Sequence, residues 1–172
     1  MALEPFAFVR DGVLVEVRNL DPADVPQHKL DADGGKLLRP FVAVAEPDHE
    51  PTLEAALVVI EITPEQVTQV WTVQRRSLEA QHAAVKTECG RRIYEPFPQW
   101  KQANLTARAT ELVNNRVVNG SLSPEEAVEF AALQSIWDWI KAVRAASDAL
   151  EALDPIPLNY TSDEHWPQTW GT

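Results

Sequence analysis

The sequence predicts an α+β protein, in which a small antiparallel β domain of hairpins or a meander precedes a helical region. Up to about residue 76 apolar residues recur at every second position, as on strands, and later at every third or fourth, as on helices. With 172 residues, of which 45% are hydrophobic, the chain suits one domain or two small ones. We therefore expect a β domain over residues 1–76, helices over 77–154 and an extended tail over 155–172.

Turn signals divide the first part into five strands. Asp11-Gly12 lies between alternating apolar runs and predicts a hairpin, because a type I′ turn needs positive φ at both central residues. A loop rich in proline and glycine follows over residues 21–35. Pro40 cannot donate to a ladder, so its strand is expected at an edge or a bulge, whereas the apolar run 56–63 predicts a central strand. The expected strands cover residues 6–10, 13–19, 37–45, 56–63 and 68–76.

Three helices are expected after the strands, and each has a recognisable start or end. Ser77 is a suitable N-cap for the first, which ends before Pro96 because proline removes an amide and clashes with the preceding turn. Gly120 can take the left-handed conformation that ends the second. The third starts with a capping box, with Ser123 as N-cap and Glu126 three residues later. The predicted ranges are 77–94, 98–119 and 124–153.

The long third helix carries an apolar seam. Spacings of three and four residues alternate along it, which is typical of a helix that packs lengthwise on another helix. At about 1.5 Å per residue the helix would be roughly 45 Å long, more than a small β domain can cover. The first two helices cover the seam either in the same chain or from a second chain, and we expect a homo-oligomer through this helix. The seam consists of Leu133, Ile136, Ile140, Val143, Ser147 and Leu150.

Tryptophan is the second feature that indicates protein binding. Trp137 and Trp139 lie two positions apart, about 200° around the helix, so only one of them can lie on the seam. The other is covered by the same chain or by a partner. Aromatic residues in the tail are suitable anchors at a protein interface, and the tail docks either on its own chain or on a partner. The expected partner-binding residues are Trp137, Trp139, Ile140, Val143, Leu150, Trp166, Pro167 and Trp170.

The sequence predicts no catalytic residues, no metal site and no cofactor, and therefore not an enzyme. The four histidines lack the spacing of a zinc site, and His82 is expected to be a packed structural residue. Cys89, the single cysteine, is interpreted as a small buried hydrophobe. No P-loop, dinucleotide or hydrolase motif occurs, and residues 33–36 are too short to hold a phosphate. The histidines are His28, His49, His82 and His165.

The charge of the chain disfavours two classes of partner. A formal net charge of −11 opposes binding to nucleic-acid phosphates or anionic lipid. No apolar stretch approaches the ~20 residues that a membrane helix needs, and the N-terminus lacks the features of a signal peptide. We therefore expect no nucleic-acid or membrane partner, and a location in the cytoplasm of the cell that makes the protein.

Three segments of the second half form a recognisable series. Residues 119–126 read NGSLSPEE, residues 137–144 read WDWIKAVR, and residues 163–167 read DEHWP. Together they resemble the C-terminal region of tailed-phage tail fibre assembly proteins, which have a glycine, a Thr/Ser-x-Glu-Glu helix start, a Trp-Lys-x-Tyr-Arg-like stretch and a closing Trp-Pro. Ile140 and Ala142 stand where that family favours Lys and Tyr.

This resemblance implies a bacteriophage tail fibre assembly protein. Such a protein acts as a chaperone that binds a tail fibre or another tail protein in the host cytoplasm during assembly. The alternative is a permanent structural component of the virion, in the tail, the baseplate or the fibre attachment. Both readings need protein–protein contacts and no catalytic site.

Overall fold

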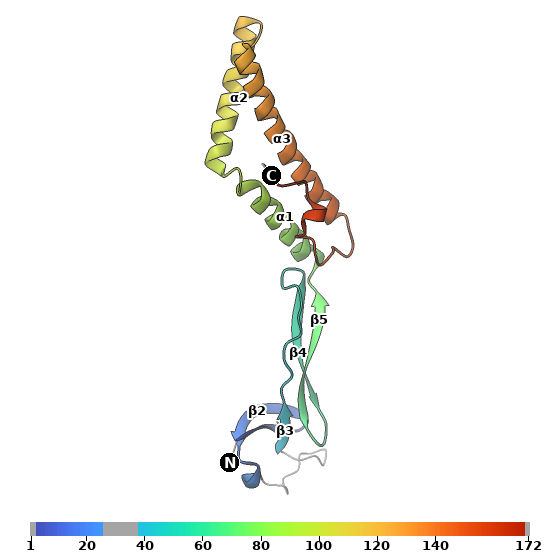
Figure 1. The fold of residues 1–172 in the computed structure, drawn as a ribbon. Helices are drawn as coiled ribbons and strands as arrows, with labels where there is room; N and C mark the ends of the chain where they lie inside the picture. Colours follow the sequence, from blue (N-terminus) through green and yellow to red (C-terminus); the bar gives the residue numbers. More distant parts are fainter. Residues whose placement is uncertain (1–2, 26–37, 171–172) are drawn as a thin grey trace. The chain divides into compact units, whose positions relative to one another are not determined.

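The computed structural model describes residues 3–25 and 38–170, which divide into two compact units, residues 1–75 and 76–172 (Figure 1). The first unit is a five-stranded sheet, and the second contains three helices and the C-terminal segment. The α+β fold class is therefore confirmed. Most of the loop expected at 21–35 lies outside the described residues, as do residues 33–36. Within the described residues, no helix combines the length and apolar content needed to cross a membrane.

The sheet is mostly antiparallel. Asp11 and Gly12 have φ values of 51° and 73°, so the predicted hairpin turn is confirmed. Neighbouring strands are antiparallel except for β3 and β5, which are parallel. The strands are β1 (Glu4–Arg10), β2 (Val13–Leu20), β3 (Leu38–Val42), β4 (Glu54–Ile62) and β5 (Val67–Arg75), in the spatial order β2-β1-β3-β5-β4.

Two expected strand positions are wrong. β3 was expected at an edge or a bulge, but it lies between β1 and β5, and its pairing with β1 has a regular register. The missing amide of Pro40 is tolerated because Pro40, opposite Phe6, ends the short ladder with β1, and the ladder with β5 begins only at Phe41. β4 was expected in the centre but forms an edge next to β5. An apolar run does not distinguish a central strand from an exposed one, because strand order depends on pairing between distant segments.

Part of the sheet in the first unit continues as two strands alone. β3 pairs with β5 only at Val67 and Thr68, so residues 54–59 of β4 and 70–75 of β5 continue as a two-stranded segment, the β4–β5 ribbon. Trp71 Nε1 donates to the carbonyl of Val44 at 2.8 Å, which ties the chain after β3 to this ribbon. One buried cluster of the described residues comprises Ala7, Val9 and Val67, with Leu14, Phe41, Ile60 and Ile62 packed against it.

The helices of the second unit begin and end at the expected signals. The Ser77 hydroxyl caps the first helix by accepting a hydrogen bond from the amide of Ala80 at 3.3 Å. Ser123 and Glu126 form the predicted capping box, at 3.2 and 3.0 Å, and Gly120 has a φ of 77°. The helices are α1 (Leu78–Tyr94), α2 (Gln99–Asn119) and α3 (Pro124–Glu151), with a short 3-10 turn, η2 (Asp163–His165), in the tail.

The seam of α3 is covered within the same chain. α2 and α3 lie side by side, and Arg108 of α2 donates two hydrogen bonds to Glu129 of α3, at 2.9 and 2.7 Å. α1 packs against the C-terminal part of α3, where Lys86 lies 3.2 Å from Glu151. The buried residues of α3 are Leu133, Ile140, Val143, Ser147 and Leu150, and those of α1 are Gln81, Val85, Glu88 and Ile93.

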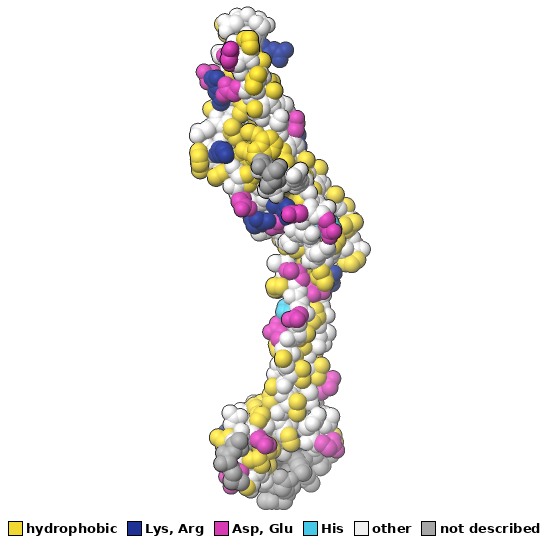
Figure 2. Space-filling view, viewed as in Figure 1, with side chains coloured by type: hydrophobic (Ala, Val, Ile, Leu, Met, Phe, Trp, Pro, Cys, Tyr) yellow, Lys and Arg dark blue, Asp and Glu magenta, His cyan; other side chains and the backbone are white. Residues whose placement is uncertain are grey.

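Apolar side chains also remain on the surface of both units (Figure 2). In the first unit Leu57, Val58 and Val59 of β4 are exposed, although they are consecutive and so point to both faces of the ribbon. In the second unit the most exposed valines flank the turn between α2 and α3. We call this group the hairpin tip; it consists of Val117, Val118 and Val128.

Candidate functional site

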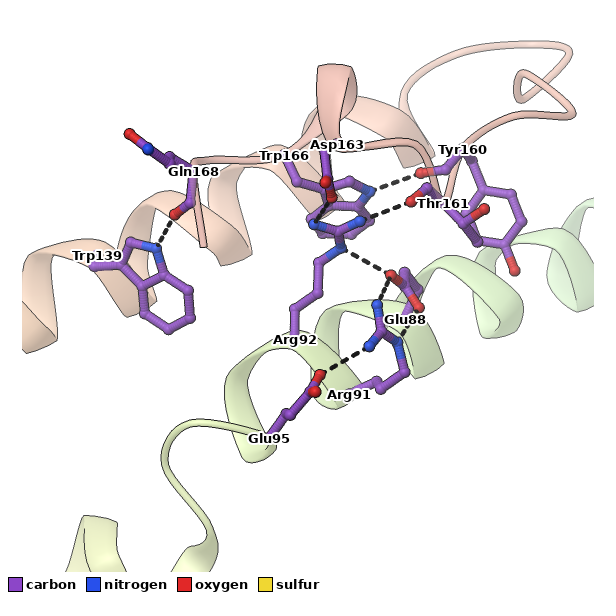
Figure 3. Close-up of polar contacts among 10 residues, drawn as sticks. All are labelled: Glu88, Arg91, Arg92, Glu95, Trp139, Tyr160, Thr161, Asp163, Trp166 and Gln168. Atoms are coloured by element: carbon purple, nitrogen blue, oxygen red, sulfur yellow. Dashed lines mark hydrogen bonds and ion pairs between the residues drawn. The ribbon is translucent and has the colours of Figure 1, made fainter. Parts of the chain in front are cut away.

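The C-terminal tail, residues 155–170, folds back onto the helices of its own unit (Figure 3). Ile156, Tyr160 and Trp166 are buried. The indole Nε1 of Trp166 donates to the carbonyl of Tyr160 at 2.6 Å, so the ring is held by a hydrogen bond as well as by packing. The sequence left open whether the tail docks on its own chain or on a partner. In the structure it docks on its own chain.

Arg92 of α1 joins the tail to the helices. Its Nε donates to Glu88 at 2.8 Å, its Nη2 donates to the carbonyl of Thr161 at 2.7 Å, and its Nη1 lies 2.8 Å from the carboxylate of Asp163. The guanidinium also lies over the ring of Trp166, 5.1 Å from its centroid. One side chain therefore uses all three of its nitrogens and its planar face to hold the tail on α1 (Figure 3).

Glu88 is the buried carboxylate beneath this arginine. Arg91 donates two hydrogen bonds to it, both at 2.7 Å, and also contacts Glu95 at 2.9 Å. Burial opposes ionisation of Glu88, but the hydrogen bonds and charges of Arg91 and Arg92 outweigh it and hold the pKa of Glu88 below its ordinary value of 4.5. The buried charge is thus compensated, and removal of either arginine would leave it partly unpaired.

Acid is expected to destabilise the helical unit through Glu88. Because the pKa in the folded state lies below the unfolded value of about 4.5, the contribution of Glu88 is complete above that value and is lost as the pH falls through the folded pKa. Glu88→Gln abolishes this titration. The difference in free energy of unfolding between the wild type and this variant should therefore shrink as the pH is lowered from neutral. Urea denaturation followed by circular dichroism measures it, and a pH-independent difference would contradict the assignment.

Trp139 is covered by an aromatic cluster that includes the tail. The ring centroids of Phe97, Trp139 and Trp170 lie 5.7 to 5.9 Å apart, at tilted or edge-on angles. The Nε1 of Trp139 donates to the carbonyl of Gln168 at 2.8 Å. Trp137 instead lines a shallow groove between α2 and α3. The two tryptophans therefore face different neighbours, as their spacing requires, and both sets of neighbours belong to the same chain.

The residues expected to bind a partner contribute mainly to the helical unit itself. Their burial follows from α1 and the tail, which are distant in sequence but pack on α3. These residues therefore leave little surface for a second molecule. The α3 seam, which was expected to hold a homo-oligomer, is largely covered by other parts of the same chain. Ile140, Val143, Leu150 and Trp166 are buried, and Trp137, Trp139, Pro167 and Trp170 are half-buried.

A cavity of about 280 Å³ remains where α1, α3 and the tail meet. Trp139, Val143 and Pro167 give it apolar walls, and Arg91 and Arg92 lie at its charged side. Since both guanidiniums are already paired with carboxylates, the cavity has no free positive charge for a phosphate or carboxylate ligand.

The remaining reactive side chains have structural surroundings. Cys89 is half-buried, and burial raises the pKa of its thiol despite a hydrogen bond with Ser147, so the thiol is protonated at neutral pH. His82 is half-buried, with Nδ1 3.9 Å from the carboxylate of Glu151. Among residues 3–25 and 38–170 no group of three or more His, Cys, Asp or Glu side chains is placed to hold a metal ion. His28 lies outside the described residues.

Several residues of the tail site were not expected from the sequence, among them Arg92, Phe97 and Tyr160. For Arg92 a signal exists, because Glu88 precedes it by four residues on the same helix face, a spacing that favours an ion pair. For Phe97 no local signal exists, since it packs against Trp139 and Trp170, which are far away in the sequence. No family model, curated protein or solved structure matches the chain.

Proposed function

We propose that this protein is a bacteriophage tail fibre assembly protein that binds the fibre or its attachment region through protein–protein contacts. The observation that carries the proposal is the hairpin tip. Val117 and Val118 in the last turn of α2 and Val128 near the start of α3 are all strongly exposed, so each lies within about two helical turns of the α2–α3 turn. Exposed apolar side chains at one end of a helical hairpin are suited to a contact with another protein.

The hairpin tip coincides with the most family-like part of the sequence. The segment NGSLSPEE, residues 119–126, forms the turn between the tip valines and contains the capping box. The cap fixes where α3 starts, and therefore fixes the position of Val128 relative to Val117 and Val118. The closing Trp-Pro, residues 166–167, supports the proposal in another way. Trp166 is buried in the helical unit and Pro167 lines the cavity of that unit, which also carries the hairpin tip.

Co-expression with the tail fibre protein of the same phage tests the proposal. The wild type should raise the yield of soluble, assembled fibre, and Val117→Lys with Val128→Lys should abolish that gain because two charges would enter an apolar contact. Val13→Lys, which alters an exposed valine of β2, serves as the matched control and should retain the gain. A fibre yield that is independent of the wild-type protein would reject the proposal.

The alternative role, a permanent component of the tail, baseplate or fibre attachment, is separated by mass spectrometry of purified virions. A transient assembly protein is expected to be absent from them. Presence at a fixed stoichiometry would reject the transient chaperone and indicate the structural role.

A further inference from the structure

Within residues 3–25 and 38–170, no strand pairs with the outer edge of β4. Among the described residues, β5 is the strand that pairs with β4, and β2 approaches β4 without pairing with it. The stretch from Ala55 to Ile60 contains no charged residue. Leu57, Val58 and Val59 within it are 44%, 49% and 47% exposed. A long apolar strand with a free edge is a template for pairing with another strand.

The other edge of the sheet, β2, is protected in two ways. It carries Glu16 and Arg18, which form an ion pair with N···O 2.6 Å, in the middle of the strand. Its ladder with β1 is also irregular, because Phe8 pairs with Glu16 and Val9 with Leu14, so Val15 is an extra residue. Charged side chains and bulges prevent edge-to-edge pairing, and the stretch 55–60 of β4 has neither.

We propose that the β4 edge pairs with β4 of a second copy of this chain, antiparallel and about a two-fold axis at Val58. In an antiparallel pair, directly opposite residues point to the same side of the sheet. The two-fold axis must therefore pass beside a residue, so that this residue lies directly opposite the same residue of the second copy. Val58 is the middle residue of the nine in β4, and centring on it pairs the whole strand. Leu57 then faces Val59 and Ala56 faces Ile60, both apolar cross-strand pairs.

The glutamates near the ends of β4 favour antiparallel pairing of two copies over parallel pairing. In the register centred on Val58, Glu61 faces Ala55 and Glu54 faces Ile62, so no two carboxylates are opposite each other. A parallel, in-register pair would instead align each glutamate with its equivalent, which is destabilising. The pairing also joins two β4–β5 ribbons into four adjacent strands, and a lone two-stranded ribbon is marginally stable in water.

Sedimentation equilibrium of the full chain tests the proposal. The wild type should be a dimer, and Val58→Lys should raise the dimer dissociation constant about tenfold or more, because it places two ammonium groups directly opposite each other. Val15→Lys, the same change at the β2 edge, should leave the dissociation constant unchanged. A monomeric wild type, or a Val58→Lys variant as dimeric as the wild type, would overturn the proposal.

Cysteine cross-linking tests the register even where Val58→Lys affects folding. In a Cys89→Ser background, Val58→Cys places two thiols on directly opposite residues, whose Cβ atoms are about 4.5–5.5 Å apart, whereas Leu57→Cys places them about 7–8 Å apart on a diagonal. Mild oxidation should therefore link the Val58→Cys protein into dimers faster than the Leu57→Cys protein. Equal rates, or no linkage at Val58, would contradict the two-fold pairing.

Discussion

Ile140→Asp should lower the free energy of unfolding of the helical unit by about 4 kcal/mol or more, since it removes a packed side chain and buries a carboxylate. Ile140 is 1% exposed and lies on the face of α3 that the rest of the unit covers. A carboxylate at this position must either stay charged without solvent or bind a proton at a cost in free energy. Urea denaturation followed by far-UV circular dichroism measures the loss, because most helical signal comes from this unit.

Val128→Asp is the matched control for this variant. It makes the same kind of change on the same helix, at a residue that is 72% exposed, and should alter the free energy of unfolding by no more than about 0.5 kcal/mol. Equal losses for the two variants would mean that Ile140 is not in the core of the unit. The prediction concerns folding, so it does not depend on the proposed function.

Trp166→Ala should be the next most damaging change, with an expected loss of about 3–5 kcal/mol. Trp166 is 6% exposed, donates to the carbonyl of Tyr160 and lies under the guanidinium of Arg92. Its removal leaves a cavity, removes the hydrogen bond to Tyr160 and leaves Arg92 without its aromatic neighbour. Hydrogen exchange measured by mass spectrometry should show faster exchange in α1 and unchanged exchange in the β strands.

Trp100→Ala provides the comparison for Trp166, because it removes the same side chain at a position that is 66% exposed. It should change the free energy of unfolding by less than about 1 kcal/mol. Truncation after Leu158 should destabilise the helical unit at least as much as Trp166→Ala, since it also removes Tyr160 and Trp170. A truncated protein with native exchange in α1 would show that the tail is not part of this unit's core.

The parts of the fold that depend on neighbouring residues could be predicted from the sequence. The Asp11-Gly12 turn, the Ser123 capping box and the Gly120 helix end each involve a few adjacent residues, and all three are present as expected. Strand pairing is different, because it joins segments whose sequences carry no mark of one another. For that reason the apolar content of β4 predicted a strand but not its place at the edge.

The same distinction applies to the candidate site. The spacing of Trp137 and Trp139 was sufficient to predict that they face different neighbours, but not what those neighbours are. The cover of Trp139 includes Gln168 and Trp170, about thirty positions later. The expectation of a partner on the α3 seam was reasonable for a helix considered alone. The sequence left open whether the seam is covered in the same chain or from a second one, and in the structure the other helices and the tail cover much of it.

The contact between Arg92 and Thr161 also has a consequence for the order in which the chain folds. It joins residues 69 positions apart, whereas the α2–α3 hairpin and the β-hairpins join close neighbours. Contacts between close neighbours form readily, and a long loop must close before distant ones form. We therefore expect α1 to remain incompletely packed during synthesis until residues 156–166 have left the ribosome. The tail then sets the time at which the helical unit, and with it the hairpin tip, becomes stably folded.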